Sequence, residues 1–359
     1  MTIAVDCRML GSGGIGTYIA SLLPYFLESH DCLLIGDKDK LNAYSSSSHA
    51  ILIPCDVEPF SLKELAVFPL SILHRINKCT IFYTPYCNIP SGIKIPVFST
   101  IHDVVFLDVP GLTSKTGVQI RKFFYQRAIN KSAALFTVSN FSAARIRTKL
   151  KCHNISIVVT YNALPAWFSS DSRYEQAEKK EQILFVGNIK KHKGLHVLLT
   201  AFKKVLNKGL SARLIIVGNA DNFRTGDKSV CAEIDTFPKE SICFTGHISD
   251  EELRNLYSQS KLLVQPSFYE GFGIPPLEAL SLGTHALVSD IPVFREIYGK
   301  FPVKFFKSGD SDDLAENIIA CMNDTSSVPG MPDCYSYKKS ADIILAAFSF
   351  YADNKKNHN

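Results

Sequence analysis

The sequence lacks the features that mark a membrane-spanning or secreted chain. Its apolar runs stay well short of the ~20 residues that a transmembrane helix needs. The first residues enter an apolar stretch directly, without the basic and apolar regions of a signal peptide. The ten cysteines are scattered and include no C-x-x-C pair, so they predict buried thiols in a reducing compartment, not a disulfide framework or a zinc site. We therefore expect a cytoplasmic protein, either soluble or held peripherally on the inner face of the membrane.

A strong charge bias is missing as well. The net charge of +5 is mild and spread along the chain, which suits anionic small molecules or a membrane surface and argues against a dedicated nucleic-acid partner. With 46% hydrophobic and 20% charged residues, the chain has the composition of a folded protein with sizeable cores. Its length of 359 residues favours two domains.

Short apolar strands alternate with helical periodicity along the first half. Strands are predicted at residues 3–7, 32–36, 50–55, 80–86, 96–102, 134–139 and 155–160. Helices are predicted at residues 19–27, 62–76, 119–131 and 142–150. Such alternation indicates a mostly parallel sheet with helices on both faces.

The pattern restarts after a polar stretch at residues 169–182, which we interpret as a linker. Strands are predicted at residues 183–187, 213–218, 242–245, 261–265 and 285–289, and Ser249 to Glu252 forms a capping box that opens a helix. The fold class is therefore α/β, with two Rossmann-like domains that face each other across a cleft. The domains are expected at residues 1–165 and 166–335.

A glycine-rich motif, Gly11 to Gly16, follows the first strand. It matches the dinucleotide-binding pattern G-x-G-x-x-G, and Asp37 ends the second strand, where a nicotinamide dehydrogenase carries its acidic residue. Three residues separate the strand from Gly11, however, whereas in the dinucleotide fingerprint the first glycine follows almost directly. The glycines predict either close approach to a phosphate or sugar, or only a tight turn.

His102 and Asp103 close an apolar strand, which places both side chains at its carboxyl end. No serine or cysteine motif accompanies His102 as a nucleophile. His102 is therefore a catalytic candidate or a structural histidine, and Asp103 is equally consistent with a local turn cap.

A basic loop opens the second half, between the strand that ends at Gly187 and the next helix. Lys190, Lys191 and Lys193 lie there with a histidine, and cations between a strand end and a helix start favour contact with a diphosphate over a merely solvated loop.

The stretch from Gln265 to Ala279 carries two carboxylates. Pro276 predicts a helix start, so Glu278 lies in the first turn near the positive end of the helix dipole. The amides of Gly273, Leu277 and Glu278 are expected to face a ligand. Glu270 and Glu278 could act as the acid and nucleophile of a glycosidase, but a first-turn glutamate is stabilised as an anion and suits a ribose diol, or simply stabilises its helix.

Together these motifs resemble the retaining glycosyltransferases of family four, which have the GT-B fold. The match rests on Glu270, seven residues and Glu278, and on further motifs in family order along essentially the whole chain. These are the segments at residues 6–10, 14–18, 137–142, 161–162, 186–194, 244–246 and 335–341. The start of the chain looks like that of the mannosyltransferase-like branch.

The resemblance implies roles for individual residues. Gly14 and Gly16 would lie near the donor phosphates and His102 near the donor sugar. Lys193 would hold the diphosphate, Glu270 with the Gly273 backbone would contact sugar hydroxyls, and Glu278 would bind the ribose. Many members carry an arginine near the position of Asn188, and here Lys190 or Lys191 would replace it. The helix at residues 336–359 would cross back onto the first domain.

The resemblance also implies a reaction. A hexose, with mannose from GDP-mannose favoured and a UDP-sugar as the other choice, would pass with retention to a glycan or lipid-linked acceptor in surface polysaccharide synthesis. No cofactor or metal would be needed, because protein cations stabilise the departing diphosphate. The basic and aromatic residues at 119–131 are typical of a membrane-surface helix, or of an ordinary amphipathic helix. A GT-B epimerase, a phosphorylase, a dehydrogenase and a non-catalytic nucleotide-sugar-binding protein remain as alternatives.

Overall fold

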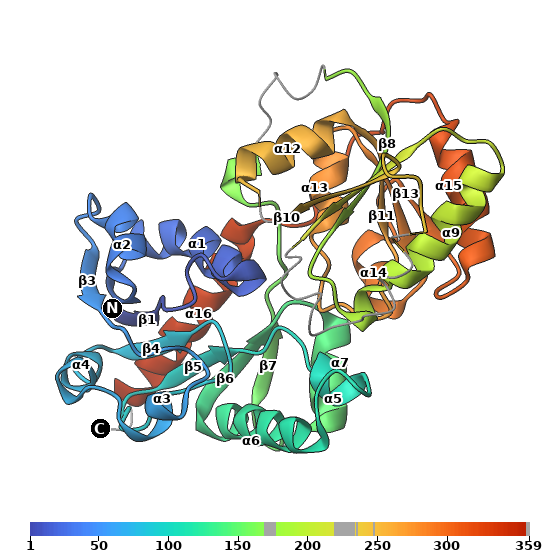
Figure 1. Ribbon diagram of the computed structural model, residues 1–359. Helices are drawn as coiled ribbons and strands as arrows, with labels where there is room; N and C mark the ends of the chain where they lie inside the picture. The colour runs from blue at the N-terminus through green and yellow to red at the C-terminus, as the bar shows by residue number, and fades with distance from the viewer. Residues whose placement is uncertain (169–176, 219–233, 235, 247, 357–359) are drawn as a thin grey trace. The chain divides into compact units, whose positions relative to one another are not determined.

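The computed structural model describes residues 1–168, 177–218, 234, 236–246 and 248–356. The chain divides into two compact units, Met1–Pro165 together with Tyr335–Asn359, and Ala166–Cys334 (Figure 1). Each unit is an α/β domain built on one parallel sheet. Residues 169–176, which hold most of the predicted linker, lie outside the described residues, and strand β8 begins within its last part, at Lys180.

The first unit contains a seven-stranded parallel sheet in the order β3-β2-β1-β4-β5-β6-β7. Its strands are β1 (Thr2–Asp6), β2 (Asp31–Gly36), β3 (Ala50–Pro54), β4 (Ile81–Thr84), β5 (Val97–Thr100), β6 (Ser132–Thr137) and β7 (Ser156–Val159). The main helices between them are α1 (Gly13–Leu27), α2 (Lys38–Leu41), α3 (Leu62–Ala66), α4 (Leu70–Ile76), α5 (Val105–Asp108), α6 (Lys115–Lys131) and α7 (Asn140–Lys149). Every predicted strand of this half is present, with ends that differ by a few residues.

One predicted helix of this unit, at residues 62–76, is wrong. The structure has two short helices, α3 and α4, and Pro69 is the N-cap of α4. Proline disfavours helical geometry at the residue before it and offers no N–H to continue a helix, which explains the break. The apolar stripe of α1 behaves as predicted, since Ile19, Leu22, Leu23, Phe26 and Leu27 are all buried.

The second unit contains a six-stranded parallel sheet in the order β10-β9-β8-β11-β12-β13. Its strands are β8 (Lys180–Val186), β9 (Arg213–Val217), β10 (Ile242–Gly246), β11 (Ser260–Gln265), β12 (His285–Ser289) and β13 (Val303–Phe306). Its longer helices are α9 (Leu195–Asn207), α12 (Asp250–Gln259), α13 (Pro275–Ser281), α14 (Pro292–Tyr298) and α15 (Ser311–Met322). The capping box of Ser249 and Glu252 is confirmed at the start of α12. The sequence pattern did not predict β13, a short edge strand that is only partly buried.

The last helix, α16 (Tyr337–Lys356), packs on the first unit. Ser340 donates a hydrogen bond from Oγ to the Tyr161 carbonyl at 2.7 Å, and Tyr351 donates to the Ala133 carbonyl at 2.6 Å. The Phe348 ring lies 4.7 Å from the Phe98 ring, centroid to centroid. The chain thus returns to the domain in which it began, as Figure 1 shows by the red helix among the blue and green strands.

Nine cysteines in the described part of the chain are free thiols, and Cys231 lies outside it. Within the same described residues, no helix is long and apolar enough to cross a membrane.

Candidate functional site

The donor-side candidates of the second unit lie at the carboxyl ends of two neighbouring strands. β8 and β11 pair in parallel, so the loops that follow them emerge at the same edge of the sheet. Gly194 marks their close approach, because a Cβ at this position would lie 2.0 Å from the Pro266 carbonyl oxygen. The basic loop and the glutamate loop are therefore in contact.

Lys193 and Glu270 form an ion pair across these two loops. The Lys193 Nζ donates to both carboxylate oxygens of Glu270, at 2.8 and 2.7 Å, and the two side chains are only 20% and 9% exposed. Sequence reasoning assigned the two residues to different parts of a donor molecule. The structure shows that they also bind each other, so the ammonium and the carboxylate form one polar centre.

Two further residues fix the Glu270 carboxylate. Ser267 Oγ and Gln265 Nε2 donate to Glu270 Oε1, at 2.7 and 3.1 Å. Burial would raise the pKa of Glu270, but the Lys193 charge and the hydrogen bonds from Lys193 and Ser267 outweigh it and hold the pKa below its ordinary value. Glu270 is therefore an oriented anion at neutral pH, suited to accepting hydrogen bonds from hydroxyl groups.

Glu278 has a different environment. It lies in the first turn of α13, is 8% exposed, and accepts a hydrogen bond on Oε2 from the Tyr257 hydroxyl at 2.6 Å. Burial raises the pKa of Glu278 to about 7, although the hydrogen bond from Tyr257 opposes the shift. The two carboxylates therefore have opposite pKa shifts, because Glu270 has a cation beside it and Glu278 has only a phenol.

The amides near the start of α13 do not all face outward. Leu277 and Glu278 both donate their N–H groups to the Ile274 carbonyl, at 2.8 and 3.2 Å. The expectation that these two amides are left for a ligand is therefore wrong, since the first turn of the helix already uses them. Gly273 is required for another reason: its φ is +83°, and a Cβ would lie 2.5 Å from the Phe294 ring.

The other residues of the basic loop differ in their exposure. Asn188 and Lys190 are exposed, and Lys190 is the N-cap of the short 3₁₀ helix Lys191–Lys193. His192 is buried, and its Nδ1 has no hydrogen-bond partner among the described residues. Burial and the neighbouring Lys193 lower the pKa of His192 to about 4, so this ring is neutral.

His102 lies in the first unit, in the segment after β5. Its Nε2 is 2.9 Å from the Pro85 carbonyl, which can only accept, so Nε2 carries the proton and Nδ1 is the acceptor atom of the neutral ring. Burial lowers the pKa of His102 to about 4. Tyr18 packs edge-on against the ring at 4.9 Å. The next residue, Asp103, accepts the Val105 N–H at 2.9 Å, as expected of a turn cap.

The two glycine candidates of the first unit differ. A Cβ at Gly16 would lie 2.5 Å from the Met9 carbonyl oxygen, so this glycine is required by the turn itself. A Cβ at Gly14 would meet nothing within 4 Å. Asp37, the acidic residue that a dehydrogenase would use, instead caps α2 by accepting the N–H groups of Asp39 and Lys40. This cap removes the main support for a nicotinamide site.

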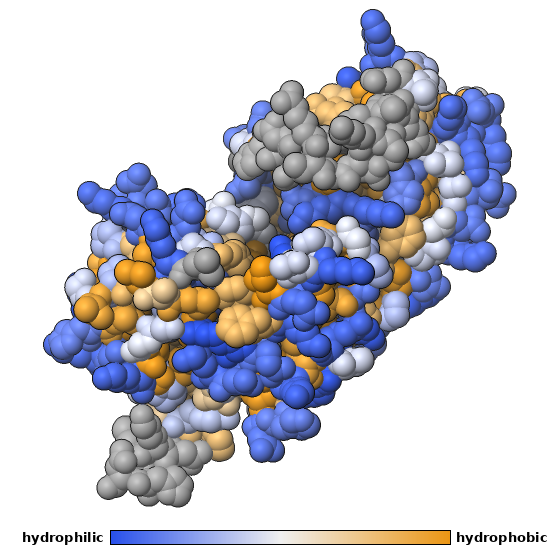
Figure 2. Space-filling model, turned by 60° about the horizontal axis from the view of Figure 1, so that its bottom comes forward, coloured by the Kyte–Doolittle hydropathy of each residue, from blue (hydrophilic) through white to orange (hydrophobic). Residues whose placement is uncertain are grey.

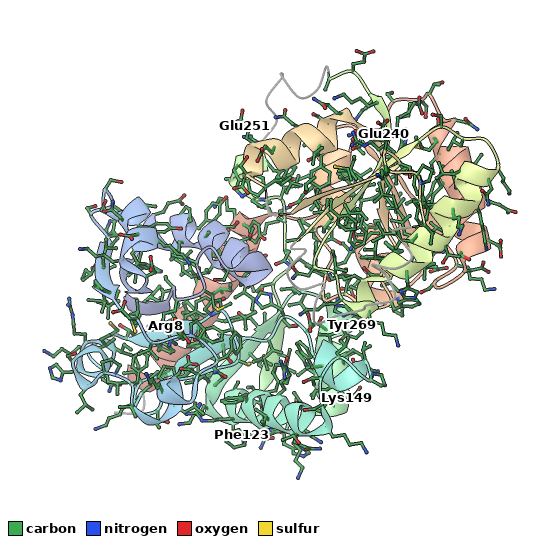
Figure 3. All side chains as sticks on the ribbon, in the orientation of Figure 1. Arg8, Phe123, Lys149, Glu240, Glu251 and Tyr269 are labelled. Atoms are coloured by element: carbon green, nitrogen blue, oxygen red, sulfur yellow. The ribbon has the colours of Figure 1, made fainter. Side chains whose placement is uncertain are left out.

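Sequence reasoning missed a buried ionic cluster in the first unit. Arg8 donates to Asp6 at 2.6 and 2.9 Å, to Glu64 at 2.5 Å and to the Tyr86 hydroxyl at 2.7 Å, and all four residues are buried. Arg8 is labelled in Figure 3. A further bond from Arg8 to the Val57 carbonyl, at 3.3 Å, holds the loop that follows β3. The contacts join residues far apart in the chain, so only the pair of Asp6 and Arg8 was visible as a pattern.

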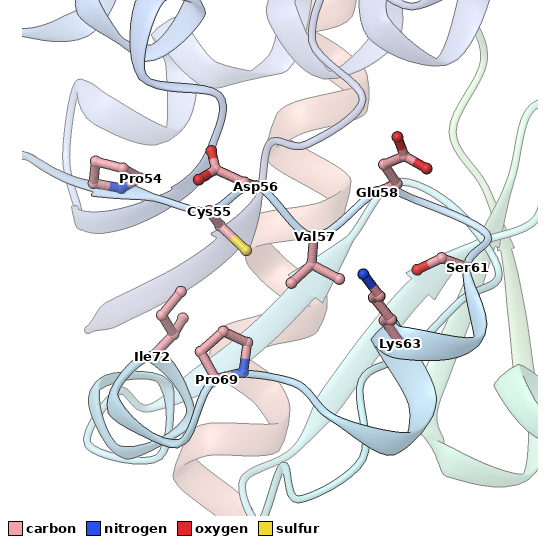
Figure 4. Close-up of a pocket in the computed structure, with 9 residues that line it drawn as sticks. All are labelled: Pro54, Cys55, Asp56, Val57, Glu58, Ser61, Lys63, Pro69 and Ile72. Carbon is pink, nitrogen blue, oxygen red and sulfur yellow. The ribbon is translucent and has the colours of Figure 1, made fainter.

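A cavity of about 700 Å³ lies beside this cluster. Figure 4 shows it between the segment after β3 and the helices α3 and α4. Its wall combines apolar, hydroxyl and charged groups: Pro54, Cys55, Asp56, Val57, Glu58, Ser61, Lys63, Pro69 and Ile72. Phe60, in the same loop, has a left-handed φ of +63° and is 54% exposed, while its N–H donates to Glu64 at 3.2 Å. A strained backbone of this kind persists only where the surrounding contacts fix it.

Comparison with solved structures defines the class of fold. The chain superposes over its full length on Anabaena Alr3699/HepE in complex with UDP-glucose, with a TM-score of 0.67 and 15% identity, covering 100% of both chains. It also matches the lipopolysaccharide outer core galactosyltransferase WaaB, with a TM-score of 0.59 and 16% identity over 99% of this chain and 100% of that one. The two parallel-sheet domains thus form a GT-B fold.

Sequence comparison finds a family match over part of the chain. Residues 169–341 match the family model described as glycosyl transferases group 1. The O-antigen chain mannosyltransferase RfbU of Salmonella typhimurium is 31% identical over 176 residues, 49% of this chain and 47% of that protein. The O-antigen chain mannosyltransferase B of Escherichia coli is 26% identical over 263 residues, 70% of this chain and 68% of that protein. The match to RfbU thus spans about half of that protein's length. The chain thus has a GT-B fold, and its residues 169–341, which make up most of the second unit, match the group 1 family model.

Proposed function

We propose that this protein is a retaining hexosyltransferase that moves mannose from a nucleotide-diphosphate sugar to a saccharide acceptor in surface polysaccharide synthesis. The observation that carries the proposal is the centre formed by Lys193 and Glu270, with Glu278 in the first turn of the helix that follows the Glu270 loop. The names of the relatives, two of them O-antigen mannosyltransferases, support mannose and polysaccharide synthesis. GDP-mannose is the first choice of donor and a UDP-sugar the second, since a structure similar to this chain holds UDP-glucose.

The proposed mechanism follows from the charge that develops during transfer. Cleavage of the bond between sugar and phosphate leaves positive charge on the sugar and negative charge on the nucleotide diphosphate. Lys193, with Lys190 or Lys191, stabilises the departing diphosphate, and Glu270 accepts hydrogen bonds from sugar hydroxyls. Asn188, in the same loop, is a further donor contact that we propose. The acceptor attacks on the face from which the diphosphate leaves, and the diphosphate helps to remove its proton.

Donor screening tests the first step of this proposal. GDP-mannose, GDP, UDP-glucose, UDP-galactose and TDP-glucose would be compared by thermal shift, followed by detection of released nucleotide with candidate acceptors. We expect GDP-mannose to give the largest shift. No shift with any of these nucleotides would contradict the donor site, and release of nucleotide without transfer would favour a different GT-B reaction.

We also propose that no metal ion is essential, because the lysines of the basic loop can supply the positive charge. Activity should persist in excess EDTA, and complete loss that added metal restores would refute this part of the proposal.

For the acceptor we propose the cavity beside Val57 and Lys63. It lies at the carboxyl end of β3, the edge at which open parallel sheets bind ligands. Apolar groups suit the CH face of a sugar ring, while Ser61, Lys63 and Glu58 suit its hydroxyls. Substitution Lys63→Ala should raise the KM for acceptor severalfold and leave the KM for donor unchanged, and a change in donor KM alone would contradict the assignment.

Peripheral membrane contact is proposed for α6. Ile120 and Phe123 are 51% and 59% exposed, and Phe123 lies on the outer side of the helix (Figure 3). Figure 2, which brings the lower side of Figure 1 forward, shows apolar surface residues interspersed with hydrophilic ones. Such a surface suits a lipid headgroup region. Phe123→Ser should reduce co-flotation with anionic liposomes at low salt, whereas absence of co-flotation by the wild-type protein would exclude the idea.

A further inference from the structure

Tyr257 is a buried phenol whose hydroxyl serves Glu278. The side chain is 0% exposed, and its OH donates to Glu278 Oε2 at 2.6 Å. Burial and the nearby carboxylate raise the pKa of Tyr257 well above its ordinary value, so the phenol stays protonated and acts as a donor. The contact links α12 to the first turn of α13.

The position of Tyr257 is itself fixed from three sides. The capping box at Ser249 anchors the start of α12, and the Thr284 hydroxyl donates to the Tyr257 carbonyl. The Phe168 ring packs edge-on against the Tyr257 ring at 5.7 Å. Since these contacts hold the phenol in place, the phenol in turn restricts the rotation of the Glu278 carboxylate.

The restriction leaves the two oxygens of Glu278 unequal. Oε2 is occupied by Tyr257, while no described residue donates to Oε1. Glu278 keeps 8% exposure, so its carboxylate is almost wholly removed from water. An acceptor that is fixed and poorly hydrated gains more from a ligand hydroxyl than a mobile surface carboxylate does.

We propose that Tyr257 is a positioning residue that directs Glu278 Oε1 toward the ribose hydroxyls of the donor and thereby makes the site selective for ribonucleotides over 2′-deoxyribonucleotides. The inference rests on the proposed function, because it assumes that Glu278 faces a nucleotide. It predicts that GDP- and UDP-sugars are accepted and that deoxythymidine-diphosphate sugars bind poorly. The simpler alternative is that Tyr257 only satisfies a buried carboxylate and has no effect on selectivity.

The test compares GDP with 2′-deoxy-GDP, and UDP with 2′-deoxy-UDP, by calorimetric titration of the full chain. The titrations are made at about pH 8, where Glu278 is ionised in spite of its raised pKa. A hydrogen bond to a charged group then contributes enough for the wild-type protein to bind each ribonucleotide roughly tenfold or more tightly than its deoxy form. Tyr257→Phe keeps the ring and should reduce this preference to about threefold or less. Glu278→Gln should reduce it too, and adding Tyr257→Phe to Glu278→Gln should cause little further change, because both act on one contact.

Tyr298→Phe is the matched control. Its hydroxyl donates to the Gly273 carbonyl, so the variant also loses a phenol near the site but does not touch Glu278. The ratio of ribonucleotide to deoxyribonucleotide affinity should remain as in the wild-type protein. Thermal melts of each variant confirm folding before titration.

The outcomes separate the two levels of inference. If the wild-type protein binds none of the four nucleotides, the proposed function fails and the role of Tyr257 fails with it. If nucleotides bind but the wild-type protein shows no preference, or if Tyr257→Phe keeps the full preference, the proposed function stands and the role of Tyr257 is refuted. If Glu278→Gln loses the preference for ribonucleotides but Tyr257→Phe keeps it, the carboxylate alone is responsible for the selectivity, and the positioning role of Tyr257 is refuted.

Discussion

Replacing Lys193 with methionine removes one partner of a nearly buried ion pair and leaves Glu270 without its cation. Breaking a buried pair in this way costs 3–5 kcal/mol, and because Lys193 keeps 20% exposure we expect the lower end, about 3 kcal/mol. For a unit of this size, each kcal/mol lost from the free energy of unfolding lowers Tm by about 2–4 °C. The Tm of the second unit should therefore fall by about 6–12 °C.

The loss should depend on pH in a defined direction. In the wild-type protein the pKa of Glu270 is lowered, so the pair stabilises the fold above the ordinary glutamate pKa and loses that effect as pH falls through the folded value. In Lys193→Met only burial and neutral hydrogen bonds remain, and the folded pKa should rise above its ordinary value. Protonation then relieves the buried charge, so the difference between variant and wild type should shrink as pH falls from about 7.5 toward about 4.5.

Thermal unfolding followed by circular dichroism at several pH values measures both effects. Lys203→Met, an exposed lysine on α9, is the control and should leave Tm within about 1 °C of wild type. The double variant Lys193→Met with Glu270→Gln should recover part of the loss, since it removes the unpaired charge. A Tm near that of the wild-type protein at pH 7.5, or a deficit that does not change with pH, would refute the reasoning. Transfer activity should fall by about 10²–10³ in Lys193→Met, the range seen when one stabilising group is lost.

Three further predictions test other parts of the structure. Glu278→Gln should stabilise the ligand-free protein by about 2–3 kcal/mol at pH 8 and have little effect near pH 5, because burial of Glu278 destabilises the fold only when the carboxyl group ionises, above its raised pKa of about 7. Urea unfolding at both pH values measures the difference, and equal effects at the two pH values would contradict the raised pKa. Gly16→Ala should lower Tm, because the new Cβ would meet the Met9 carbonyl oxygen. Gly14→Ala should be neutral or stabilising by up to about 1 kcal/mol, because a Cβ there meets nothing. Similar thermal melts for the two variants would show that the turn between β1 and α1 is not closely packed at Gly16. Arg8→Met should destabilise the first unit by at least about 3 kcal/mol, because it leaves the buried carboxylates of Asp6 and Glu64 without their cation. Urea unfolding measures the loss, and a value below about 1 kcal/mol would mean that water reaches these carboxylates.

Much of the fold was predictable because local signals agree with one another. Strands β1 to β12 are apolar runs bounded by turn residues, and the alternation with helical periodicity indicates a parallel sheet. The break at Pro69 and the edge strand Val303–Phe306 were not predicted. The first was overlooked because the apolar spacing continues across the proline, and the second carries only a short and partly exposed pattern.

The sequence by itself determined the two α/β halves, the capping box at Ser249 and the residues that resemble a donor site, because each is written in consecutive or regularly spaced positions. It also identified Glu270 and Glu278 as important, but not what distinguishes them. Only the tertiary structure brought Lys193 to Glu270 and Tyr257 to Glu278, contacts between residues 77 and 21 positions apart. Those partners decide the charge and orientation of each carboxylate, because burial makes the ionisation of a group depend on whichever side chains pack against it.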